Sequence, residues 1–65
     1  MGITNELRAK MIYFSMVILI RKPGTQEFEN FLLVLDTVKQ KFGVSGRVAR
    51  TSVETAARRL LEDAK

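Results

Sequence analysis

The 65-residue chain contains no cysteine and no histidine, and these two absences exclude much of the chemistry available to small proteins. Without cysteine there is no disulfide and no thiolate metal site. Without histidine there is no imidazole ligand and no imidazole base to activate a hydroxyl nucleophile. The seven carboxylates are scattered, and the adjacent pair Glu62 and Asp63 would point apart on a helix. We therefore expect no catalytic site, no metal site and no cofactor.

The chain also lacks an apolar run long enough to cross a membrane. Its longest apolar stretch is MIYFSMVILI at residues 11–20, about half of the roughly 20 residues that a spanning helix needs. A signal peptide has an apolar region of this length, but Arg21, Lys22 and Pro23 replace the small residues of a cleavage site. We expect no membrane span, and the lack of cysteine is compatible with a cytoplasmic location.

A chain of this length forms one domain, here residues 1–65, and a core this small usually only just balances the conformational entropy lost on folding. Small domains are commonly stabilised by disulfides, a metal ion or a partner chain. The first two are excluded by composition, so the apolar stretch at residues 11–20 predicts a homo-oligomer or a docking surface for another protein.

Two breaks that contain glycine, at residues 22–25 and 43–50, divide the chain into three segments. Each segment has apolar residues at helical spacing, so we expect helices at about residues 5–21, 26–42 and 52–64. The first two would form an antiparallel hairpin, and the third would cover one side. The predicted fold class is therefore a small all-α, three-helix domain that is oligomeric.

The second predicted helix has the clearest apolar stripe, formed by Phe28, Phe31, Leu32, Leu35, Val38 and Phe42. Thr25 is in a position to cap its start. Gly43 follows its last apolar residue, as a left-handed C-terminal cap requires, and Val44 can pack back over the end. Lys39 and Lys41 fall in the last turn, where the helix dipole favours cations.

The third predicted helix begins at Ser52, because Thr51 and Glu54 have the spacing of a capping box. Its apolar stripe consists of Val53, Ala56, Ala57, Leu60, Leu61 and Ala64. The small residues in this stripe would allow another helix to approach closely.

The first segment has two interpretations. Residues 12–20 could be a buried strand, which would give a β-α-α chain with the strand paired across a dimer. An unbroken segment of about 17 residues is long for a strand and ordinary for a helix, so we favour a helix, with Thr4 as its cap. That helix would be apolar nearly all round, with one stripe formed by Leu7, Met11, Phe14 and Ile18. The predicted oligomer interface consists of Ile12, Met16 and Leu19, together with Leu33 of the second helix.

The formal net charge is +4, and four arginines lie within thirteen residues: Arg47, Arg50, Arg58 and Arg59. A guanidinium donates two parallel hydrogen bonds to a phosphate, so this cluster is the candidate nucleic-acid site. Arg58 has Glu54 and Glu62 four residues away on either side, which favours helical ion pairs instead. Arg47 and Arg50 are expected on a loop without such partners.

Residues 38–46, VKQKFGVSG, resemble the end of the first helix and the turn of a helix-turn-helix motif. The motif needs a turn of about 3–4 residues before its second helix. The capping box at Thr51 places that helix several residues too late, and an earlier start at Arg47 would give up the cap. A ribbon-helix-helix dimer also fits poorly, because both faces of a strand at residues 12–20 would be apolar and offer no base-reading side chains.

Two function classes follow. The first is a small nucleic-acid-binding or regulatory module that uses a basic loop and the C-terminal helix. The alternative is a protein–protein interaction or assembly module that docks through its apolar N-terminal segment. The first class predicts an affinity that falls steeply with salt, and the second predicts an affinity that changes little.

Overall fold

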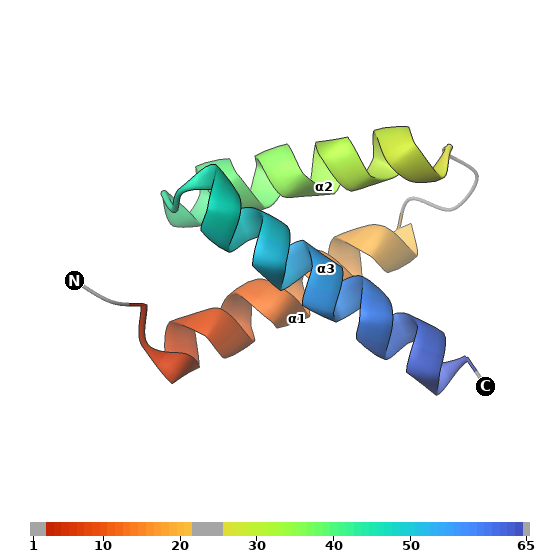
Figure 1. Cartoon of the computed structure of the whole chain (residues 1–65), viewed down its shortest axis with the longest axis horizontal. Coiled ribbons are helices and arrows are strands. Elements are labelled where there is room, and N and C mark those ends of the chain that lie inside the picture. Colours follow the sequence, from red (N-terminus) through yellow and green to blue (C-terminus); the bar gives the residue numbers. More distant parts are fainter. Residues whose placement is uncertain (1–2, 22–25, 65) are drawn as a thin grey trace.

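The computed structural model describes residues 3–21 and 26–64, which form three helices: α1 (Asn5–Arg21), α2 (Glu27–Phe42) and α3 (Gly46–Asp63). Each helix packs against the other two, and α3 crosses α1 on its way from the end of α2 (Figure 1). The all-α, three-helix fold is confirmed. The predicted turn at residues 22–25, with Thr25 as a cap, falls outside the described residues.

Helix α1 begins as expected, because the backbone N–H of Leu7 donates to Thr4 Oγ1 at 3.1 Å. Residues 12–20, for which a strand was the alternative, lie inside this helix. Met11 is fully buried, and Leu7, Phe14 and Ile18 pack against the core around it. Ser15 is also buried, and its hydroxyl donates to Met11 O at 2.7 Å, so the polar group stays satisfied.

Helix α2 is rotated relative to the stripe that its sequence predicts. Val34 and Val38 are fully buried at its centre, whereas Phe28 is 71% exposed and Leu32 is 45% exposed. The prediction was therefore wrong for Phe28 and Leu32, and it missed Val34. At the other end of α2, Phe42 meets Phe14 of α1 edge to face with ring centroids 5.5 Å apart.

The connection between α2 and α3 is three residues long, from Gly43 to Ser45. Gly43 has φ 62° and ψ 31°, and its N–H donates to Lys39 O at 3.0 Å, which confirms the left-handed cap. Val44 packs against the core, as expected. Ser45 is the N-cap of α3, and its Oγ accepts from the N–H of Val48 at 3.4 Å.

The predicted start of α3 at Ser52 is wrong by six residues. Thr51 lies inside the helix, where its hydroxyl donates to Arg47 O at 3.0 Å instead of capping. The earlier start is favoured by packing, because it adds a helical turn that buries Ala49 and places Ser52 in the interior. None of the helices in the described part of the chain is long and apolar enough to span a membrane.

Candidate nucleic-acid interface

The outward side of α3 carries all four arginines that the sequence singles out. Arg47, Arg50, Arg58 and Arg59 are exposed, while Ala49, Ser52, Val53 and Ala56 face the core from the same helix. Arg47 and Arg50 belong to the first two turns of α3 and not to a loop, which corrects the expectation from sequence. Helical geometry therefore determines where each guanidinium points.

The helical start gives Arg50 a partner that a loop position would not supply. Arg50 Nε lies 3.0 Å from Glu54 Oε1, one turn further along α3. The expected pairing of Arg58 with Glu54 or Glu62 is not present: among the described residues, no carboxylate lies within ion-pair distance of Arg58. Three of the four arginines of α3 therefore have no carboxylate partner within residues 3–21 and 26–64: Arg47, Arg58 and Arg59.

A fifth arginine, which the sequence analysis did not select, joins this surface from α1. Arg8 and Arg47 line the same cleft between α1 and α3, which has a volume of about 160 Å³, together with Val48, Thr51 and Ser52. The cleft therefore brings Arg8 and Arg47 to one opening, beside Thr51, whose hydroxyl donates to Arg47 O. Arg8 is remote from Arg47 in the chain, and only the crossing of α1 and α3 makes them neighbours.

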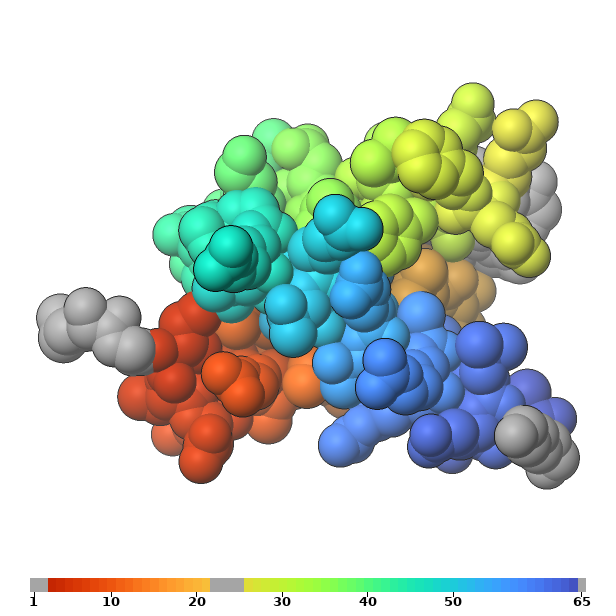
Figure 2. Space-filling model, viewed as in Figure 1, coloured from red at the N-terminus to blue at the C-terminus, as the bar shows by residue number. Residues whose placement is uncertain are grey.

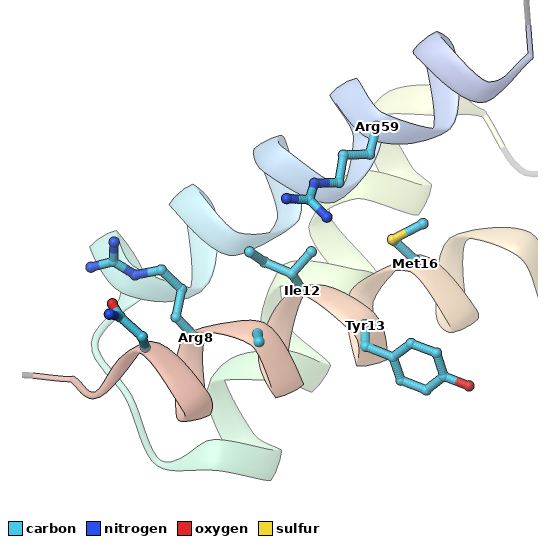
Figure 3. A pocket seen from close by; sticks show the side chains of 7 residues that line it. Arg8, Ile12, Tyr13, Met16 and Arg59 are labelled. Atoms are coloured by element: carbon cyan, nitrogen blue, oxygen red, sulfur yellow. The ribbon is translucent and has the colours of Figure 1, made fainter.

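Arg8 also borders a second groove, where Arg59 of α3 faces it. Figure 3 shows both guanidiniums reaching toward the gap between α1 and α3, with Ile12 between them. The groove has a volume of about 250 Å³ and is lined by Asn5, Arg8, Ala9, Ile12, Tyr13, Met16 and Arg59. No acidic side chain lines either of these two clefts within the described residues. We call Arg8, Arg47, Arg58 and Arg59 the arginine face.

Of the predicted oligomer interface, only Ile12 and Met16 line a common cleft among the described residues. Ile12 and Met16 are half-buried beside Arg59, Leu19 packs against the core, and Leu33 is 51% exposed on α2. Tyr13 of α1, which is 71% exposed, was not among the predicted interface residues.

Another apolar cleft lies at the open end of the domain, where the first turns of α2 and the last turns of α3 part (Figure 2). Leu19, Phe31, Ala57, Leu60 and Leu61 supply its apolar lining, and Glu27 and Asn30 line it as well. It contains none of the arginines, so it is separate from the arginine face.

No cluster of acidic side chains that could hold a metal ion occurs among residues 3–21 and 26–64. Comparisons with protein-family models, with curated proteins and with solved structures find no match. The function is therefore inferred from the arginine face and from the elements that carry it.

Proposed function

We propose that this chain binds duplex DNA as a module of the helix-turn-helix type, in which α2 and α3 form the motif and α3 enters the major groove. The observation that carries this proposal is the three-residue connection between Phe42 and Gly46. A turn of about 3–4 residues that often contains glycine joins the helices of this motif. Residues 38–46 resemble the helix end and turn of a helix-turn-helix motif. Because α3 starts at Gly46, the second helix of the motif follows this turn directly.

The first turns of α3 carry the side chains that such a motif presents to base edges. Arg47 and Thr51 are exposed there, one turn apart, and Arg50 lies beside them. An arginine can read guanine through two parallel hydrogen bonds, and a threonine hydroxyl can contact either kind of base pair. These residues are the proposed base-reading set.

The other arginines suit contacts with the DNA backbone. Arg8 comes from a different helix, and Arg58 and Arg59 lie about three turns beyond Arg47 along α3. Arg47 and Arg58 are roughly 16 Å apart along α3, and Arg8 lies on another helix. Arginines spread over this distance suit several phosphates of a DNA backbone better than a single small anion. The formal net charge of +4 favours association with such a polyanion.

Duplex DNA is favoured over RNA and over single strands. The major groove of an RNA duplex is too narrow for a helix such as α3. Single-stranded nucleic acid is commonly bound by stacking several bases on aromatic side chains. The sequence of α3 contains no aromatic residue, and Tyr13 of α1 is the one aromatic side chain that lines either of the two clefts among the described residues.

The test is a fluorescence anisotropy titration of a labelled random-sequence DNA duplex at low salt. We expect the wild-type chain to bind. The double variant Arg8→Gln, Arg47→Gln should lose about ten-fold or more in affinity, because it removes a charged hydrogen bond to phosphate from Arg8 and one to a base edge from Arg47. Circular dichroism of each variant checks that the helices remain.

The matched control is the double variant Lys10→Gln, Lys41→Gln. It lowers the formal net charge from +4 to +2, as the arginine variant does, but removes charges that line none of the clefts between α1 and α3. Equal losses for the two variants would show that net charge alone drives binding. No binding of duplex DNA by the wild-type chain would reject the proposal.

A further inference from the structure

Helix α1 carries two apolar stripes with the same spacing on opposite sides. The inner stripe, Leu7, Met11, Phe14 and Ile18, packs in the core. The outer stripe repeats the intervals of four, three and four residues two positions later, at Ala9, Tyr13, Met16 and Ile20. Alternating intervals of three and four residues are the spacing of a coiled-coil seam.

Three of the four outer-stripe residues are exposed, and the fourth, Met16, is half-buried beside Arg59 of α3. Tyr13 is 71% exposed and Ile20 is 61% exposed, and Ala9 is exposed as well. Figure 3 shows the Tyr13 ring directed away from α3. An apolar stripe of this regularity on the outside of a small domain marks a surface for another helix.

The size of the side chains favours a second copy of α1 in the antiparallel direction. In that arrangement Ala9 lies opposite Ile20 of the other copy, and Tyr13 lies opposite Met16. Each small or flexible side chain then meets a large one, and the Met16 thioether contacts the Tyr13 ring, which is a favourable pair. Parallel helices would instead place Tyr13 against Tyr13 and Ala9 against Ala9, which leaves clashes and gaps along one seam.

Charge favours the same direction. Glu6 stands in the first turn of α1 and Arg21 in the last. Glu6 Oε1 lies 3.6 Å from Lys10 Nζ of its own helix, and both side chains are well exposed, so Glu6 can be shared with a second cation. The antiparallel register brings Glu6 of one copy to within about two residues, roughly 3 Å along the axis, of the level of Arg21 in the other. Parallel helices would leave Glu6 and Arg21 at opposite ends of the pair, without this attraction.

We infer that this protein forms a two-fold symmetric homodimer through the outer stripe of α1, with the two α1 helices antiparallel. The inference rests on α1 alone and is tested without DNA, although Ala9, Tyr13 and Met16 also line the groove that Arg8 and Arg59 of the arginine face border. A symmetric interface uses the same patch on both copies, as the complementary ends of the outer stripe require.

Sedimentation of the pure protein without nucleic acid tests the dimer. We expect a dimer at micromolar concentration, and a monomer for the variant Tyr13→Glu, Ile20→Glu, which places a charge in each half of the seam. Both side chains are exposed in the single chain, so circular dichroism should remain helical. The control variant Leu33→Glu changes an exposed leucine of α2 and should remain dimeric.

Single cysteines test the direction, because the natural chain contains none. A mixture of Ala9→Cys and Ile20→Cys chains should form a mixed disulfide on oxidation. Ile20→Cys alone should not, because its two copies would be about 16 Å apart along an antiparallel pair. Ready crosslinking of Ile20→Cys with itself would show parallel helices and overturn the proposed direction.

Charge exchange provides a test that leaves the apolar seam intact. Arg21→Glu alone should weaken the dimer by about two- to five-fold, as expected for an exposed ion pair, and the double variant Glu6→Arg, Arg21→Glu should restore it. A wild-type chain that sediments as a monomer at micromolar concentration overturns the inference. The outer stripe would then serve a different protein or a lipid surface, which flotation with anionic vesicles would reveal.

Discussion

Arg50 Nε lies 3.0 Å from Glu54 Oε1 on α3, whereas Arg47, one turn before it on the outward side, has no carboxylate partner among the described residues. The two arginines that the sequence treats as equivalent therefore differ in the charge that they present. Both side chains of the pair are well exposed, at 67% and 50%, so the pair contributes little to stability. The ion pair instead affects how strongly Arg50 can attract a DNA phosphate or base.

We predict that Arg47→Ala weakens duplex DNA binding more than Arg50→Ala does, because Glu54 already offsets the charge of Arg50. The variant Glu54→Gln should strengthen binding, since it releases Arg50 and removes a carboxylate that repels phosphate. Anisotropy titrations of the three variants at one low salt concentration measure both effects. Equal losses for Arg47→Ala and Arg50→Ala would contradict the ion pair's role.

The start of α3 is tested by two hydroxyl deletions. Ser45→Ala removes the N-cap and should lower the free energy of unfolding by about 0.5–2 kcal/mol. Thr51→Ala should change it little, because the Thr51 hydroxyl bonds within the helix and alanine is the better helix former. Urea unfolding followed by circular dichroism gives both values. If Thr51→Ala lowered the free energy of unfolding more than Ser45→Ala does, the helix would begin at Ser52, as the sequence predicts.

The turn between α2 and α3 is tested by two glycines whose added methyl groups would meet open space. Gly43 has φ +62°, so Gly43→Ala should destabilise the fold by about 1 kcal/mol. Gly46 is the first residue of α3, and Gly46→Ala should stabilise by about 0.4–1 kcal/mol through a less flexible unfolded chain. Opposite signs in urea unfolding are the expected result, and stabilisation by both substitutions would exclude the left-handed cap.

The rotation of α2 is tested by its two terminal phenylalanines. Phe42→Ala should cost about 3–5 kcal/mol, because the ring packs edge to face on Phe14 next to the core. Phe28→Ala should change the free energy of unfolding by about 0.5 kcal/mol or less, as for other exposed positions. Thermal or urea unfolding distinguishes them, and similar costs would restore the stripe predicted from sequence.

Sequence patterns were sufficient where one local signal agreed with the packing. The Thr4 cap and the Gly43 cap were predicted correctly, and so was the helical character of residues 5–21. They failed at α3, where two caps competed. Thr51 and Glu54 have the complete capping-box spacing, whereas Ser45 has no acidic residue three positions later. Burial of Ala49 and Ser52 against the other helices decides for Ser45, and no local pattern contains that information.

The arginine face could also be predicted from the sequence only in part. Arg47, Arg58 and Arg59 could be selected from their clustering along the chain, but Arg8 could not. Its place beside Arg47 depends on the crossing of α1 and α3, which is a tertiary property. The ion pair of Arg50 was missed for a related reason, because it requires the helix to begin before residue 50.

The salt dependence of DNA affinity tests the proposed function most directly. Phosphate contacts from Arg8, Arg58 and Arg59 should give a slope of log K against log salt of about −2.7 for duplex DNA, at about 0.9 per phosphate. The variant Arg8→Gln, Arg47→Gln removes one of these phosphate contacts, that of Arg8, and should make the slope shallower by about 0.9, while Lys10→Gln, Lys41→Gln should leave it unchanged. A slope that is the same in both variants, or the absence of binding at low salt, would contradict the assignment of the arginine face.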